Sequence, residues 1–78
     1  MNQARKQLLN LIKTRSTIAK EIKDYNFRYY FVRRANEDFE HFEKNEGVEV
    51  TDEMVQQAEK DVKQMERIKV VQNSIYII

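Results

Sequence analysis

The chain has 78 residues with no Pro, Cys or Trp and a single Gly, and its 14 Lys and Arg residues nearly balance 13 Asp and Glu residues. This length allows one small domain over residues 1–78. The scarcity of turn-forming residues argues against a β-sandwich or barrel and favours long helices. Without Cys there is no disulfide framework, no thiolate metal ligand and no thiol nucleophile. No apolar run approaches the roughly 18 residues that span a bilayer.

Residues 2–23 are predicted to form one amphipathic helix. Its apolar residues recur at the three- and four-residue steps of a helical stripe, namely Leu8, Leu11, Ile12, Ile18, Ala19 and Ile22. Arg15 interrupts this stripe and is expected to snorkel from its edge into solvent. Asp24 and Asn26 supply capping oxygens, which predicts that the first helix stops there and a second one begins.

The second predicted helix spans residues 26–44, and we expect its buried side to be aromatic. Seven of the eight Phe and Tyr residues lie between Tyr25 and Phe42. The positions expected to face the core recur at three- and four-residue steps, namely Phe27, Tyr30, Phe31, Ala35, Phe39 and Phe42. Rings so concentrated would supply most of the area that a small core can bury.

A third helix is predicted over residues 52–75, after a connection that holds the single Gly. Thr51 is expected to cap it, with Asp52 and Glu53 in its first turn near the positive end of the helix dipole. Beyond Arg67 the apolar residues cover more than one face, namely Ile68, Val70, Val71, Ile75, Tyr76, Ile77 and Ile78. A bundle this small cannot bury them all, so part of this surface is expected to contact another protein. A frayed apolar tail is the alternative.

The charges are separated along the chain. Residues 1–34 hold nine basic and two acidic side chains, a balance of +7, whereas residues 35–78 hold five basic and eleven acidic ones, a balance of −6. Such asymmetry is typical of a basic face offered to one partner, and equally of charge complementarity between helices.

The residues that could support catalysis do not converge in the sequence. His41 is the only imidazole and lies in an acidic run, where a solvated role is favoured over a base or a ligand. Glu37, Glu40 and Glu43 have the spacing of a metal strip, but a solvated helix face is the better interpretation. We therefore predict a protein that is not an enzyme and that holds no metal.

The strongest local feature is the run from Tyr25 to Arg34, in which aromatic rings alternate with Arg and Asn. Aromatic residues interleaved with Arg can bind RNA by stacking and phosphate contacts. The acidic segment that follows, and the need for rings in the core, argue against RNA. A protein partner with hot spots at Tyr and Arg fits the same residues better.

This run carries a resemblance to a known family. Together with Asp38-Phe39, Ala58, Asp61, Arg67 and Val71, it resembles the LYR-family accessory subunit of mitochondrial cysteine desulfurase. The resemblance implies an all-α, antiparallel three-helix bundle of LYR type that binds and stabilises the pyridoxal-phosphate desulfurase during iron–sulfur cluster assembly. It implies no cofactor of the chain's own, no nucleic acid, no membrane, and only an indirect contact with the assembly scaffold. The location implied is the mitochondrial matrix or a reduced, mitosome-like organelle.

The resemblance also implies which residues bind partners. The matching positions, expected to contact the desulfurase or a second copy of the adaptor, are Tyr25, Arg28, Tyr30, Arg34, Phe39, Val62, Arg67, Ile68, Val71 and Ile75. A LYR-type assembly factor for a respiratory complex would share the fold but bind a different client, and the Tyr-Asn-Phe-Arg run disfavours it.

Two departures from the family pattern concern acyl carrier protein, which these relatives also bind. The signature Leu-Tyr-Arg falls on Leu11-Ile12-Lys13, so the ring is lost and the guanidinium becomes a point charge. The basic residues that would meet the acidic carrier are replaced, and the positions concerned are Asn36, Glu40 and Glu43. Like charges repel across an interface. We therefore predict that carrier binding is weakened or lost, with the chain's own side chains filling the space of the acyl group.

A basic patch on the first helix is the one feature that could compensate for this loss. It would consist of Arg5, Lys6 and Lys13.

Overall fold

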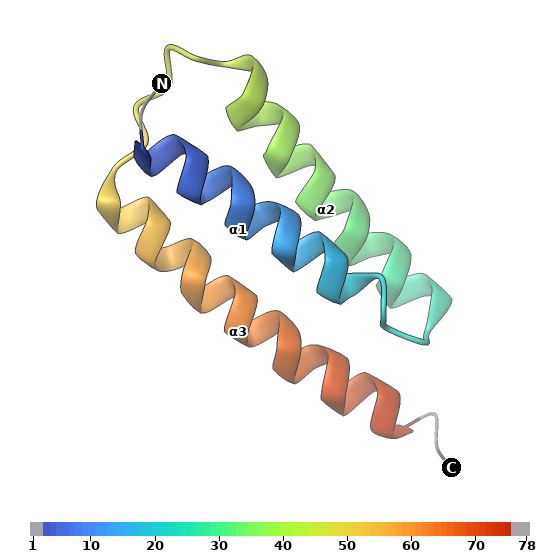
Figure 1. The fold of residues 1–78 in the computed structure, drawn as a ribbon. Coiled ribbons are helices and arrows are strands. Elements are labelled where there is room, and N and C mark those ends of the chain that lie inside the picture. Colours follow the sequence, from blue (N-terminus) through green and yellow to red (C-terminus); the bar gives the residue numbers. More distant parts are fainter. Residues whose placement is uncertain (1–2, 76–78) are drawn as a thin grey trace.

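The computed structural model describes residues 3–75, which form three α-helices (Figure 1). Helix α1 spans Gln3–Ala19, α2 spans Tyr25–Lys44 and α3 spans Asp52–Ile75, with α2 antiparallel to α1 and α3. The predicted all-α three-helix bundle is confirmed. Asn2, which was assigned to the first helix, and residues 76–78, which were counted in the apolar segment, lie outside the described residues. Within residues 3–75 no helix combines the length and apolarity needed to cross a membrane.

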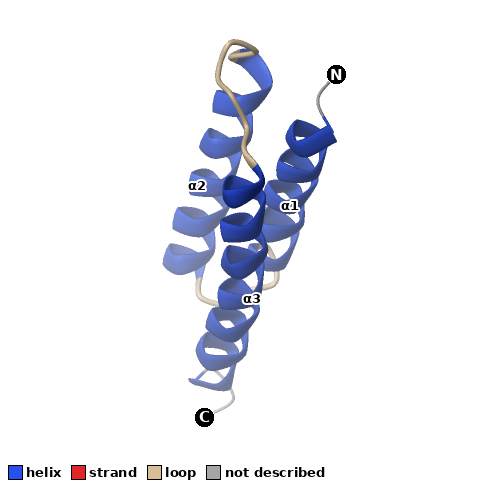
Figure 2. Ribbon diagram, turned by 90° about the vertical axis from the view of Figure 1, so that its left-hand side faces the viewer, coloured by secondary structure: helices blue, strands red, loops and turns tan. Residues whose placement is uncertain are grey.

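Helix α1 lies in the middle of the bundle. Figure 1 shows it between α2 and α3, and both outer helices pack along it. Among the described residues, α2 and α3 make no close backbone approach to each other. The molecule measures 47 × 20 × 12 Å, so the helices form an elongated, shallow bundle. In the side view, α3 lies in front of the other two helices (Figure 2).

The first helix ends earlier than predicted, at Ala19 rather than Lys23. The N–H of Glu21 donates to the carbonyl of Ile18 (3.0 Å), and the N–H of Ile22 donates to that of Ala19 (3.1 Å). Such three-residue hydrogen bonds tighten the chain and end an α-helix. Ile22 is nevertheless completely buried. The apolar spacing therefore predicted the burial of Ile22 correctly. Ile22 is buried from the turn that follows α1, however, rather than from the helix itself.

The two predicted caps are present. The Asp24 carboxylate accepts hydrogen bonds from the N–H groups of Asn26 (2.9 Å) and Phe27 (3.2 Å), so α2 begins at Tyr25. The Thr51 hydroxyl oxygen accepts from the N–H of Met54 (3.3 Å) at the start of α3. Both side chains satisfy backbone donors that the first turn of a helix leaves free.

The core is aliphatic, which corrects the prediction of an aromatic one. Its fully buried apolar residues are Leu8, Ile12, Ile18, Ala19, Ile22, Ala35, Val50, Val55, Ala58 and Met65. On α2 only Ala35 is buried, whereas six side chains of α1 are. Phe27 and Tyr30 are 45% and 54% exposed, and the other aromatic side chains expected in the core are partly buried. The reason is geometric, because α2 packs against a single helix and only a narrow stripe of it is covered.

Candidate partner-binding surface

Large exposed apolar side chains gather at one end of the molecule, where the α1–α2 connection lies beside the last turns of α3 (Figure 1). We call this set the aromatic end, and its members among the described residues are Tyr25, Phe27, Tyr29, Tyr30, Val70, Val71 and Ile75. Each is between 45% and 65% exposed. Helix α3 has 24 residues and α1 has 17, so at 1.5 Å per residue α3 is longer by about 10 Å. Its last turns therefore have little of α1 to pack against.

The rings at the start of α2 are ordered by contacts with each other. Tyr25 and Tyr29 stack with centroids 6.3 Å apart, and Phe27 and Phe31 stack at 6.4 Å. The Arg28 guanidinium lies 5.7 Å from the centre of the Tyr25 ring. This arrangement presents preformed aromatic surface at low entropic cost to a partner.

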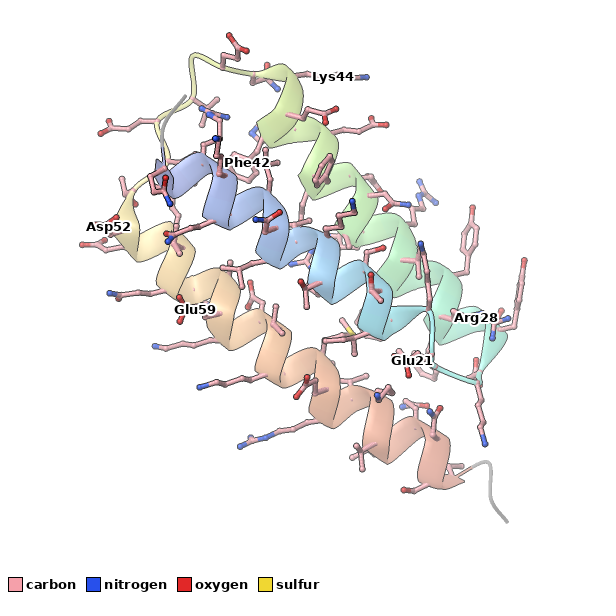
Figure 3. The ribbon with its side chains drawn as sticks, in the orientation of Figure 1. Glu21, Arg28, Phe42, Lys44, Asp52 and Glu59 are labelled. Atoms are coloured by element: carbon pink, nitrogen blue, oxygen red, sulfur yellow. The ribbon has the colours of Figure 1, made fainter. Side chains whose placement is uncertain are left out.

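Arg28 is less available to a partner than the sequence suggested. Its Nη1 donates to the carbonyl oxygens of Ile22 (3.0 Å) and Lys23 (3.4 Å). Figure 3 shows Arg28 and Glu21 together at this end of the molecule, opposite Lys44 and Asp52. The guanidinium therefore holds the α1–α2 connection as well as contributing to the surface.

The predicted partner-binding residues fall on two faces of α2. Tyr30, Arg34 and Ile68 lie together on a groove of about 330 Å³ between α2 and α3. Tyr25 and Arg28 line a different groove of about 430 Å³, between α2 and the end of α1. The residues on α2 thus do not form one continuous contact surface.

The remaining predicted residues divide between surface and core. Arg67, Val71 and Ile75 are exposed on α3. Phe39 and Val62 are partly buried and pack against the core clusters, so a partner reaches only part of each side chain.

The positions of the predicted acyl-carrier patch are all exposed on α2. Asn36 and Glu40 line the same groove as Tyr25, whereas Glu43 lies farther along, beside the α2–α3 connection. Glu37 pairs with Arg33 (3.2 Å), and Glu40 pairs with Lys44 (3.8 Å). These four-residue pairs are those of a solvated helix face.

The degenerate motif on α1 lies partly in the core and partly at the surface. Leu11 is partly buried and Ile12 is 4% exposed in the core. Lys13 is exposed at the edge of a groove of about 280 Å³ that Asn36 also lines.

Arg5 does not belong to a basic surface patch, which corrects the prediction for this residue. It is 9% exposed, and its guanidinium donates to the carbonyl oxygens of Phe42, Glu46 (3.2 Å) and Val48. Carbonyls at the end of a helix carry partial negative charge, and a planar guanidinium can bind several of them together. Lys6 and Lys13 are exposed, as expected.

Sequence reasoning missed the anchoring role of Asn73. Its Oδ1 accepts from the N–H of Lys23 (2.9 Å), and its Nδ2 donates to the carbonyl of Glu21 (3.1 Å). Lys69 adds an ion pair to the Glu21 carboxylate (3.5 Å). The end of α3 is therefore tied to the α1–α2 connection. No local signal reveals this, because the partners are 50 residues or more apart in the chain.

Sequence reasoning was also wrong about Arg15. Rather than snorkelling from the edge of the stripe, its side chain is 14% exposed and reaches between Asp38 of α2 and Asp61 of α3.

A helical bundle with a preformed aromatic and apolar end belongs to the class of protein-binding adaptors. The comparison with known families identifies which one. The chain belongs to the ISD11 family, whose family model matches residues 1–78. This is the LYR-family accessory subunit of cysteine desulfurase, an adaptor in iron–sulfur cluster assembly. The family is a mitochondrial assembly component and an accessory rather than a catalytic protein. No curated protein and no solved structure gave a significant match.

Proposed function

We propose that this chain binds its cysteine desulfurase through the aromatic end and stabilises the enzyme by covering apolar surface on it. The single observation that carries the proposal is the gathering of every large exposed apolar side chain of residues 3–75 at this end. Large exposed apolar side chains gathered in one region mark interaction sites, and Tyr is enriched among binding hot spots. Because only the folded forms bind, each protein raises the apparent stability of the other in a concentration-dependent way.

The contacts would come from both outer helices. Tyr25, Tyr30 and Arg34 would contribute from α2, and Val71 and Ile75 from α3. Arg67 and Ile68 would extend this surface along α3, whereas Phe39 and Val62 would contribute mainly by packing. The pyridoxal phosphate belongs to the desulfurase, and the chain would hold no cofactor of its own. It would act in the mitochondrial matrix or in a reduced mitochondrion-related organelle.

The second part of the proposal is that binding of acyl carrier protein is weakened or lost. The exposed carboxylates of Glu40 and Glu43 support it, because an acidic partner would be repelled there. The partly buried rings of Phe39 and Phe42 support it too, since they pack against the core that Leu8 helps to form. They fill space that an inserted acyl chain would need.

The test is co-expression of this chain with its cognate cysteine desulfurase and acyl carrier protein, followed by intact mass of the purified complex. We expect the desulfurase without the carrier. Recovery of acylated carrier protein in a stoichiometric amount would overturn only the second part of the proposal, that carrier binding is weakened or lost. Absence of the desulfurase would overturn the first part, and a respiratory-complex client in its place would identify the chain as an assembly factor of the same fold.

A double variant tests whether the carboxylates of Glu40 and Glu43, rather than the net charge of the chain, prevent binding of the carrier protein. The double change Glu40→Lys and Glu43→Lys should increase recovery of the carrier, because it removes the repulsion. The matched control, Glu53→Lys with Glu59→Lys, makes the same charge change at exposed positions of α3. If both pairs increase recovery equally, net charge rather than this patch controls binding.

A further inference from the structure

A single side chain connects all three helices. Arg15, on α1, has its Nη2 atom 2.6 Å from Oδ2 of Asp38 on α2, and its Nη1 atom 3.9 Å from Oδ2 of Asp61 on α3. The Arg15 side chain is 14% exposed, and those of Asp38 and Asp61 are 39% and 34% exposed. The guanidinium is thus held between two carboxylates at the partly covered centre of the bundle.

This contact lies where the backbones of α2 and α3 stay apart from each other. Helices α2 and α3 pack on α1 but make no close backbone approach to each other among the described residues. Two hollows, of about 190 and 330 Å³, lie between them, and the side chains of Arg15, Asp38 and Asp61 line both. We call the two hollows together the α2–α3 groove. The guanidinium therefore crosses the middle of this groove.

Three of the residues proposed to bind the desulfurase, Tyr30, Arg34 and Ile68, lie on the two walls of the same groove. Arg34 is one helical turn from Asp38 on α2, and Ile68 is two turns from Asp61 on α3. A partner that contacts both walls requires one particular separation of α2 and α3. Any freedom in that separation must be lost on binding, which weakens the affinity.

We propose that Arg15 is a positioning residue that holds α2 and α3 at their binding-competent separation and thereby sets the affinity for the desulfurase. The proposal rests on the proposed function, because it uses the desulfurase contacts on both helices. The chemistry favours a geometric role. Ion pairs with partly exposed carboxylates contribute little to stability. The guanidinium instead fixes the direction of the Asp38 carboxylate by a hydrogen bond and attracts the Asp61 carboxylate by its charge.

The first experiment measures the separation of the helices in the free protein. Because the chain has no Cys, His41→Cys on α2 and Lys60→Cys on α3 introduce two unique sites for nitroxide labels at exposed positions. Pulsed electron-spin distance measurements should give one narrow distribution with Arg15 present. With Arg15→Leu the distribution should broaden, while helicity and the melting temperature stay close to those of the parent.

The second experiment measures the affinity of the unlabelled chain for its purified desulfurase by titration calorimetry. Arg15→Leu should weaken binding roughly tenfold through lost preorganisation. Arg15→Lys retains the charge without the fork and should weaken it less, and it also serves if Arg15→Leu does not fold. The matched control is Lys44→Leu, which removes an exposed cation paired with Glu40 at the end of α2 that lies away from the aromatic end and should leave the affinity unchanged.

The outcomes separate this proposal from the one on which it rests. Unchanged affinity of Arg15→Leu, or an unchanged narrow distance distribution, overturns the positioning role even if the desulfurase binds. Equal losses for Arg15→Leu and Lys44→Leu also overturn it, because the loss of one positive charge would then explain both. If the parent chain fails to bind the desulfurase, the proposed function is contradicted, and so is the role of Arg15 in setting the affinity. The distance measurement still decides whether Arg15 fixes the helices.

Discussion

At the scale of single residues, two side chains distant in sequence hold the ends of the bundle together. Asn73 binds the backbone of the α1–α2 connection, and Arg5 binds the backbone at the end of α2 and in the α2–α3 connection. The α1–α2 connection is thereby attached to α3, and the α2–α3 connection is attached to α1. Polar side chains, rather than additional apolar packing, therefore fix both connections.

Replacing Asn73 should loosen one end of the molecule. Asn73→Ala removes both hydrogen bonds to the connection and should lower the free energy of unfolding by about 1–2 kcal/mol. Asn73→Asp retains the acceptor for the N–H of Lys23 but loses the donor to the Glu21 carbonyl, so it should cost less than Asn73→Ala. Thermal melting followed by circular dichroism measures both, with Ser74→Ala as the exposed neighbouring control. Equal melting temperatures for Asn73→Ala and the control would show that water replaces these bonds without loss.

Replacing Arg5 should be more costly, because its charge-assisted hydrogen bonds are partly buried. Arg5→Met keeps the apolar stem but leaves several carbonyl groups without their donor, and should lower the free energy of unfolding by about 3 kcal/mol. The control is Lys6→Met, which changes the neighbouring exposed side chain and should have an effect of at most about 0.5 kcal/mol. Urea unfolding measures both. A stable Arg5→Met variant would argue against a role for Arg5 in holding the connection.

At the scale of elements, α3 combines two functions along its length. Its part up to Met65 packs on α1 through Val55, Ala58 and Met65, whereas its last turns expose Val70, Val71 and Ile75. An amphipathic helix normally shows one apolar stripe. The broadening of the stripe beyond Arg67 therefore marks the change from core to surface, and it was visible in the sequence.

Charging the last turns of α3 should separate binding from folding. Val71→Asp and Ile75→Asp each alter a side chain that is more than half exposed, so helicity and melting temperature should change little. Desulfurase binding should fall by at least about thirtyfold, the loss typical of a hot-spot residue. Gln56→Asp introduces the same charge on an exposed part of the first half of α3 and should not affect binding. Retention of binding by both apolar-to-Asp variants would exclude this part of α3 from the interface.

The limits of sequence-based prediction are also clearest for elements. The caps at Asp24 and Thr51 were predictable because the donor and the acceptor lie within three residues of each other. The aromatic core was wrongly predicted because periodicity shows which face of α2 is apolar but not how much of it a neighbouring helix covers. The roles of Arg15 and Asn73 were beyond prediction, since their partners are 23 to 52 residues away.

At the scale of the whole molecule, the charge asymmetry of the sequence becomes a spatial one. Basic side chains such as Lys23 and Arg33 accompany the aromatic end, while Glu46, Glu49 and Asp52 surround the opposite α2–α3 connection. Part of the asymmetry is used within the fold, because Arg15 and Arg33 of the basic half pair with carboxylates of the acidic half. The remaining separation favours one orientation of approach to a charged partner.

The central place of α1 has a consequence for local opening of the native state. Either outer helix can detach while the other stays packed, but α1 cannot unfold without losing both of its interfaces. Amide hydrogens in the middle of α1 should therefore exchange with solvent last, and those of α2 and α3 should exchange sooner. Since the outer helices also carry the proposed binding residues, the most mobile parts of the free adaptor would be those that gain most protection when the partner binds.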